Sequence, residues 1–263
     1  MSNFFTLDHL DSLTISGPDA VAFAQAQFTN DIAAIESDRW FPGAWCDPKG
    51  RVLTVMLAGR REQRVELVMP VTQIDTVTDR LKLFAIGRKV EFTVGRPVCG
   101  SRDVVGNTAT LSFDTRRTIV LDQGECRQDD EERTHWQRDD LEARFPWLSP
   151  DCAGRHLPQS LGLEALGGLS YSKGCFPGQE VIARVHYRGK VGYRAVHVHF
   201  DADSPSPGCA LRLEDGRRVG EMLWSLRVGD GTKGLAVVSI EVDDGTQLYA
   251  EGSNDGGSGR VSL

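Results

Sequence analysis

The hydrophobic pattern of this chain changes once, at Gly192, and this change limits the folds that the chain can adopt. Before Gly192, stretches with the two-residue period of a strand alternate with stretches that have the period of a helix. After Gly192, only short strand-like stretches remain, separated by glycine-rich turns. We therefore predict an α+β fold over residues 1–192, made of two interleaved subdomains, and a small β-barrel over residues 193–263.

The same pattern predicts individual elements. Asp19 is expected to cap a helix over 20–35, and strands over 52–57 and 65–69 to pair antiparallel. The other elements expected before Gly192 are a strand over 13–16, a helix over 71–84, strands over 90–94, 108–113 and 118–121, a loop or helix start in the acidic stretch 128–132, a helix over 139–145 and loops over 150–161. The barrel is expected to contain strands over 195–200, 211–213, 219–224 and 234–242, and a long turn over 252–259.

Composition excludes several classes of protein. The formal net charge of −7 disfavours a dedicated nucleic-acid binder, so no direct nucleic-acid partner is expected. No stretch approaches the roughly 20 apolar residues of a membrane span, and the first residues lack the pattern of a signal peptide. The six cysteines are scattered, which favours mostly reduced thiols over a disulfide scaffold or a zinc site. We expect a cytoplasmic protein with no metal site.

The segment from Lys173 to Glu180 is the most informative in the chain. Pro177 and Gly178 suit the two central positions of a type II turn, and a short helix is expected to follow. Cys175 lies between Gly174 and this turn, so its thiol is expected at a surface or cleft. Lys173, Arg184 and the helix N-terminus would all favour its thiolate, the reactive form. A structural cysteine in a glycine-rich connection remains the alternative.

This segment resembles the signature of the YgfZ family, in which Lys-Gly-Cys is followed by an aromatic residue, any residue and Gly-Gln-Glu. Four other segments resemble family segments in the family's order: 15–20, 27–31, 47–50 and 187–190. The resemblance covers most of the chain and is weakest over 95–133 and in the barrel.

The resemblance implies a fold like that of the aminomethyltransferase of glycine cleavage (T-protein), with domains around a central channel that holds tetrahydrofolate. It also implies a role in the assembly or repair of iron–sulfur enzymes, including enzymes that modify tRNA. The expected ligand is therefore tetrahydrofolate, and the expected protein partners are iron–sulfur enzymes or their assembly proteins.

The resemblance also suggests site residues. Cys175 and Lys173 are the expected reactive pair, within a motif that includes Gly174, Phe176, Pro177 and Gly178. The expected folate contacts are Trp136, Gln27, Asn30, Tyr171, Gln179, Glu180 and Arg184. Trp136 would stack on a flat ring of the folate, although a tryptophan here can equally cover the edge of a core. A second aromatic contact of some members falls near Leu10 and is absent, and Arg144 stands where many members have glycine. The cations Arg51, Arg184, Arg188 and Lys190 are candidates for the glutamate carboxylates of the folate.

A true aminomethyltransferase is the main alternative, and a redox-sensing module built on Cys175 is another. In aminomethyltransferases the strand after the turn that resembles 47–50 carries a pair of aspartates. Here that strand begins Arg51-Val52-Leu53-Thr54 and carries no carboxylate. Loss of a positioned acid–base group typically costs ~10²–10⁴ in rate. We therefore expect no classical aminomethyltransferase activity, and whether the protein is an enzyme at all stays open.

Overall fold

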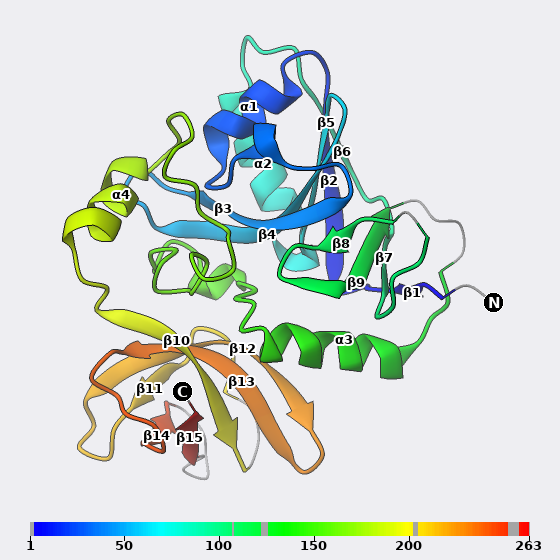
Figure 1. The fold of residues 1–263 in the computed structure, drawn as a ribbon. Coiled ribbons are helices and arrows are strands. Elements are labelled where there is room, and N and C mark those ends of the chain that lie inside the picture. The colour runs from blue at the N-terminus through cyan, green and yellow to red at the C-terminus, as the bar shows by residue number, and fades with distance from the viewer. Residues whose placement is uncertain (1–2, 107, 122–125, 202–204, 252–257, 263) are drawn as a thin grey trace.

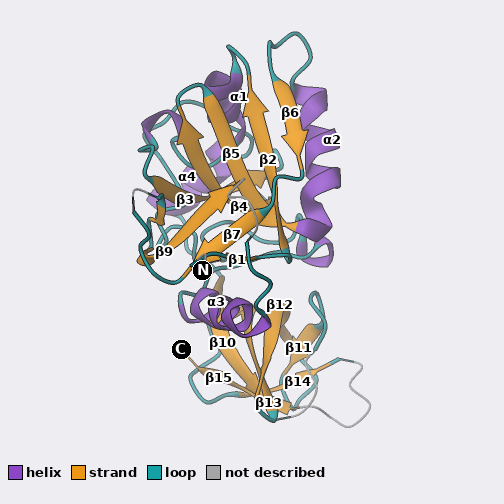
Figure 2. Ribbon diagram, turned by 90° about the vertical axis from the view of Figure 1, so that its right-hand side faces the viewer, coloured by secondary structure: helices purple, strands orange, loops and turns teal. Residues whose placement is uncertain are grey.

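The computed structural model describes residues 3–106, 108–121, 126–201, 205–251 and 258–262. Within these residues, a curved nine-stranded sheet with helices around it lies above a closed barrel, and one long helix runs between the two (Figures 1 and 2). The strand order in the sheet is β1-β7-β9-β8-β3-β4-β5-β2-β6, and that in the barrel is β10-β13-β12-β11-β14-β15. The α+β class predicted from the sequence is confirmed.

The elements have the following bounds. The sheet strands are β1 (Phe5–Thr6), β2 (Leu10–Ser16), β3 (Arg39–Cys46), β4 (Val52–Arg61), β5 (Arg64–Pro70), β6 (Glu91–Val94), β7 (Val98–Ser101), β8 (Thr110–Leu111) and β9 (Asp114–Leu121). The helices are α1 (Ala20–Gln27), α2 (Ile74–Phe84), α3 (Asp130–Glu142) and α4 (Gln179–Arg188), with 3-10 turns η1 (Ile32–Ala34), η2 (Val71–Gln73) and η3 (Pro150–Cys152). The barrel strands are β10 (Tyr193–Phe200), β11 (Ala210–Arg212), β12 (Arg218–Val228), β13 (Gly231–Ser239), β14 (Gln247–Ala250) and β15 (Ser258–Ser262).

Strand β4 lies between β3 and β5 and is apolar on both faces. Because successive side chains of a strand point to opposite faces, β4 contributes to two separate cores. Val55 and Leu57 belong to the core on the side of the barrel, whereas Met56 and Ala58 belong to the core that includes residues of α1 and α2. A nearly continuous apolar run is therefore what this central position requires.

The barrel shares the first of these cores with the sheet. Leu223, Leu235 and Val237 of the barrel lie in the same buried cluster as Leu57 of β4. A second cluster fills the barrel interior. The first barrel strand begins at Tyr193, but the division of the chain into domains at residue 192 stays our interpretation, because apolar packing is continuous across it.

Helix α3 is held by a buried ion pair. Asp140 accepts hydrogen bonds from Arg117 of β9 at 2.7 Å and from the indole of Trp147 at 2.9 Å. The helix ends where Arg144 adopts a φ of 54°, in the left-handed region that favours glycine. This conformation gives a physical reason why a glycine suits the position of Arg144.

Most of the predicted elements are confirmed. Strands β4 and β5 pair antiparallel, with Leu57 opposite Val68. The acidic stretch begins helix α3, and Asp129 caps it by accepting from the amide of Glu132. The four predicted barrel strands correspond to β10, β11, β12 and β13, whereas β14 and β15 were not predicted. Most of the turn predicted over 252–259 lies outside the described residues, and residues 258 and 259 begin β15.

The helix predicted over 20–35 is wrong in its second half. Helix α1 ends at Gln27, and Phe28 is extended, with φ −104° and ψ 157°. The backbone of Thr29 then donates to Ala44 of β3, so this segment pairs with β3 instead of continuing the helix. Asp19 does occupy the N-cap position, but its carboxylate accepts from the amide of Lys89 and does not cap the helix.

The prediction of mostly reduced cysteines holds for four of the six, and the other two form a disulfide. Cys99 of β7 and Cys126 form a disulfide. They meet because β7 pairs with β9 and with β1, and Arg127 forms a bridge with Phe5 of β1. Cys46, Cys152, Cys175 and Cys209 are free thiols. Among the described residues no helix is long and apolar enough to cross a membrane.

Candidate functional site

The turn at Pro177 and Gly178 has the predicted geometry. Gly178 has φ 79° and ψ 0°, the values of the third residue of a type II turn, and the amide of Gln179 closes the turn on the carbonyl of Phe176. A Cβ on Gly178 would lie 2.5 Å from the Cα of Gly50 and 2.6 Å from the carbonyl oxygen of Asp47. The signature turn and the turn over 47–50 therefore contact each other backbone to backbone, and only glycine fits between them.

The polar segment after α1 contacts the chain just before the signature. The hydroxyl of Thr29 donates to the carbonyl of Gly168 at 2.8 Å, and the amide of Ser170 donates to the carbonyl of Thr29 at 2.9 Å. The side-chain amide of Asn30 donates to the carbonyls of Pro42 and Gly167. Because these groups are buried, leaving any of them unpaired would cost about 1–3 kcal/mol.

Lys173 joins the same two segments. Its side chain is 8% exposed, and its ammonium donates to the backbone carbonyls of Gln25, Phe28 and Asn30, where α1 ends. These carbonyls lie at the negative end of the helix dipole, which favours a cation. Burial lowers the pKa of Lys173 to about 8, and the charge of Asp31 opposes that shift. Lys173 thus fixes the start of the signature segment, and the catalytic role expected for it stays a prediction.

Cys175 follows this anchor and is exposed, as predicted. The next residue, Phe176, is buried, and its ring centroid lies 4.9 Å from the ammonium of Lys173. The chain is thus anchored on both sides of Cys175, by Lys173 before it and by Phe176 after it. This arrangement presents the thiol at the surface of an ordered loop.

The other predicted contacts lie around this loop. Tyr171 stacks on His186 of α4 with ring centroids 3.9 Å apart, and burial together with Glu164 raises the pKa of Tyr171 to about 12. The side-chain amide of Gln179 lies 3.5 Å from the carbonyl oxygen of Lys173. Glu180 and Arg184 are exposed on α4. Their roles as folate contacts stay predictions.

A cavity of about 120 Å³ opens between β4, α2 and the loop after α3. Its lining includes Trp45, Leu53, Thr72 and Arg80. The indole of Trp45 donates to Gln27, and the guanidinium of Arg80 lies 5.4 Å from the Trp45 ring centroid. The cation of Arg80 makes no ion pair within the described residues. The hydrogen bond to Gln27 therefore fixes the orientation of the Trp45 ring, which lines the cavity. Arg80 adds a positive charge to the same lining.

A second cavity of about 230 Å³ also includes Thr72 in its lining, and we call the two together the Thr72 cleft. Sheet, helix and barrel all contribute to this second part, which is lined by His9, Leu10, Pro70, Thr72, Gln137, Trp147, Leu148, Ser149, Pro207, Leu223, Trp224 and Ser225. The indoles of Trp147 and Trp224 donate to Asp140 and to the carbonyl of Phe145. Their polar atoms are thus already paired within the protein.

His9 is the unusual group in this cleft. Both of its ring nitrogens are buried and have no hydrogen-bond partner in the part of the chain that the structure describes. Burial lowers the pKa of His9, although Asp140 and Asp8 oppose the shift. A neutral imidazole offers one donor and one acceptor, and leaving them unpaired is costly unless a ligand or water completes the site. Sequence reasoning missed His9 and Arg80, because each is an isolated polar residue far along the chain from the signature.

Trp136, the expected stacking residue, lies in the core. Its ring is 1% exposed, Phe5 packs against it edge-on at 6.1 Å, and Arg117 lies over it at 4.7 Å. Direct stacking on a folate would require one of these neighbours to move. The next residue of α3, Gln137, lines the Thr72 cleft instead. The role of Trp136 in folate binding stays a prediction.

Comparison with known proteins places these features in context. No family model matches the chain. A tRNA-modifying protein YgfZ of Vibrio vulnificus is 28% identical over 288 residues, which covers 95% of this chain and 88% of the relative. A protein of the same name from Yersinia enterocolitica is 28% identical and covers 86% of this chain, and an uncharacterized protein of Haemophilus influenzae is 30% identical over 72% of it.

The chain belongs to the YgfZ family. The crystal structure of the glycine cleavage aminomethyltransferase T of Bartonella henselae has a TM-score of 0.68 with this chain, covers 99% of it and is 15% identical. That likeness shows a shared fold. The family signature is thus the loop over residues 173–180. Lys173 binds it to the segment 27–31, and Gly178 packs it against the turn over 47–50; both segments resemble parts of the family.

Replacing Gly178 by alanine tests the contact between the two turns. The new Cβ would meet backbone atoms at 2.5 and 2.6 Å and would occupy a left-handed conformation. We expect Gly178→Ala to lower the free energy of unfolding by about 2–4 kcal/mol. Gly174→Ala is the matched control, since nothing lies within 4 Å of its Cβ. Denaturant unfolding measures both, and equal losses would contradict the contact.

The lowered pKa of Lys173 predicts a pH dependence of stability. Its folded pKa of about 8 lies below the ordinary value of 10.5, so between these values the unfolded chain binds more protons. The free energy of unfolding should therefore rise with pH in this window, by up to about 3 kcal/mol. The measurement is the difference between the parent and Lys173→Met at each pH, which cancels other groups. A difference that stays constant from pH 7 to 10.5 would argue against a strained ammonium.

Proposed function

We propose that this protein binds tetrahydrofolate in the Thr72 cleft and supports tRNA modification through iron–sulfur enzymes, with Cys175 as its reactive group. The observation that carries the ligand proposal is His9, which lines the second cavity with Trp147 and Trp224 and whose two buried ring nitrogens have no hydrogen-bond partner among the described residues. Flat heteroaromatic ligands are bound by such apolar walls with a few polar groups that fix orientation. A pterin has both donors and acceptors at its edge, which suits a neutral histidine and the amide of Gln137.

The first cavity of the Thr72 cleft suits the glutamate portion of a folate. Trp45 supplies an aromatic wall in the first cavity, and Arg80 supplies a cation without a carboxylate partner in the described residues. A carboxylate of the glutamate portion would form a charge-assisted hydrogen bond with this guanidinium. The protein of Bartonella henselae with the same fold is an aminomethyltransferase, and we extend folate use to this chain on that likeness.

Two relatives are named tRNA-modifying protein YgfZ, and we extend that role to this chain. Cys175 supports an accessory role, because a stable iron–sulfur cluster normally needs about four thiolates, and this loop offers one. A single exposed cysteine fits transient ligation or repair. The net charge of −7 favours protein partners over direct binding of tRNA.

Nothing at the site favours a true aminomethyltransferase. Leu53 lines the cleft, and the hydroxyl of Thr54 donates to the side chain of Gln73, so this part of β4 carries no carboxylate. The position at which that chemistry needs an acid–base group is therefore apolar or already paired.

The folate proposal is tested by titration. Tetrahydrofolate should quench the fluorescence of the five tryptophans in a saturable manner. Arg80→Gln should weaken binding about tenfold, because it removes one charge-assisted hydrogen bond. Arg64→Gln, an exposed arginine on β5, is the control and should leave affinity unchanged. His9→Phe should also weaken binding. Absence of saturation in the parent protein would refute the proposal.

Cys175 is tested separately, by labelling and by complementation. At neutral pH an alkylating reagent should label Cys175 before the other free thiols, because it is exposed and because burial raises the pKa of Cys46, Cys152 and Cys209. Cys175→Ser should fold normally but fail to restore iron–sulfur-dependent tRNA modification in a strain that lacks the protein. Cys209→Ser should restore it. Full restoration by Cys175→Ser would make the cysteine structural.

A further inference from the structure

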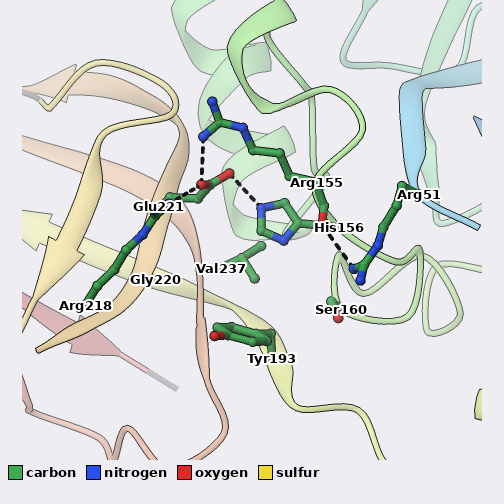
Figure 3. A pocket seen from close by; sticks show the side chains of 9 residues that line it. All are labelled: Arg51, Arg155, His156, Ser160, Tyr193, Arg218, Gly220, Glu221 and Val237. Carbon is green, nitrogen blue, oxygen red and sulfur yellow. Dashed lines mark hydrogen bonds and ion pairs between the residues drawn. The ribbon is translucent and has the colours of Figure 1, made fainter. Parts of the chain in front are cut away.

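A third cavity, separate from the Thr72 cleft, lies between the loop over residues 155–160 and the barrel. Its volume is about 370 Å³, and it shares no lining residue with the cleft. Figure 3 shows three arginines around it, Arg51, Arg155 and Arg218, which come from three separate parts of the chain. Arg51 follows the turn that contacts Gly178, whereas Arg218 begins barrel strand β12.

One carboxylate pairs with two of these arginines and with His156. Glu221 is 3% exposed and accepts from Arg155 at 2.9 Å, from Arg218 at 2.8 Å and from His156 at 2.8 Å (Figure 3). Burial opposes its ionisation, but the hydrogen bonds from His156 and Arg155 outweigh this and lower the pKa of Glu221. Glu221 therefore stays charged and holds two arginines at the edge of the cavity.

The cavity nevertheless keeps an excess of positive charge. Three arginines face one glutamate, which leaves two positive charges when His156 is neutral. The guanidinium of Arg51 donates to the carbonyl of Arg155 and has no carboxylate partner within the described residues. Water reaches these cations, since the side chains of Arg155 and Arg218 are 45% and 53% exposed, and the group therefore forms an accessible positive field that attracts an anion.

Two hydroxyl groups in the lining also lack partners. Ser160 is 6% exposed, and neither its hydroxyl nor that of Tyr193 makes a hydrogen bond to any residue in the described part of the chain. The exposed ring of Tyr193 adds an apolar surface, and the buried Val237 lies behind the cavity. Guanidinium groups and hydroxyls together are the usual donors to phosphate oxygens, and the ring offers a surface for an organic group.

We infer that this cavity binds the phosphate group of a small organic phosphate monoester. A monoester carries a charge of about −1.5 to −2 at pH 7, close to the excess of two positive charges, whereas a simple carboxylate would neutralise half of it. The negative charge of the whole protein disfavours a long nucleic acid, and the recessed position favours a small molecule.

The probes are inorganic phosphate and adenosine 5′-monophosphate, titrated by calorimetry at constant ionic strength. Both should bind at one site, and the nucleotide should bind more tightly because it also contacts the exposed ring of Tyr193. Arg218→Gln and Arg51→Gln should each weaken binding about tenfold, by loss of a charge-assisted hydrogen bond. Arg217→Gln and Lys49→Gln are matched controls, since each removes a neighbouring exposed cation outside the cavity and should change affinity less than twofold.

Three outcomes would overturn the inference. The first is absence of saturable binding of either probe, and the second is an equal loss in Arg217→Gln and Arg218→Gln, which would indicate non-specific attraction. The third is that tetrahydrofolate with a polyglutamate tail binds through Arg218 while the nucleotide does not, so that the cavity recognises carboxylates. Thermal unfolding of each variant checks that it is folded. The titration uses no folate in its main arm, so its result is independent of the folate proposal.

Discussion

The ammonium of Lys173 sits on the carbonyls that α1 leaves unpaired at its C-terminus. Its partner Phe28 lies 145 residues earlier in the chain, so this one contact ties the signature loop to the first helix. A helix that ends against β3 must satisfy its last carbonyls, and here a buried cation does so. Phe176 packs over the same ammonium, and Gly178 then meets the turn at Gly50. The exposure of Cys175 follows from these anchors.

The same end of α1 leads to the cleft. Gln27, the last residue of the helix, accepts the indole proton of Trp45, and Trp45 forms a wall of the first cavity. A short chain of contacts thus connects the signature loop with the region proposed for folate. The second cavity depends instead on Asp140, which orients Trp147 while it holds Arg117 and hence α3 against the sheet. Two buried polar networks therefore position the walls of the two cavities that form the Thr72 cleft.

Charge is distributed unevenly over the molecule. The chain as a whole is acidic, yet Arg51, Arg155 and Arg218 gather around one buried glutamate. Glu221 forms ion pairs with both Arg155 and Arg218. Its single negative charge therefore holds two guanidinium groups in place and neutralises only one of them. A net charge computed from composition describes the average surface and does not describe such a local field.

The sequence by itself determined the local features. Pro177 and Gly178 specify a type II turn because their own φ preferences do so, and the apolar run of β4 specifies a strand buried on both faces. The barrel class followed from short strands and glycine turns, although β14 and β15 were missed and the start of β15 had been predicted as a turn. The family resemblance rested on the same kind of local pattern, and the comparisons bear it out.

Only the tertiary structure decided which distant residues meet. The early end of α1, the burial of Trp136 and the disulfide between Cys99 and Cys126 all depend on how β3, β7 and β9 pass one another. The arginines of the third cavity and the unpaired nitrogens of His9 have no local signature, because nothing near them in sequence determines what they face. The φ preference of a residue and the period of hydrophobic residues depend on neighbours in the sequence. The contacts named here form only when distant parts of the chain fold together.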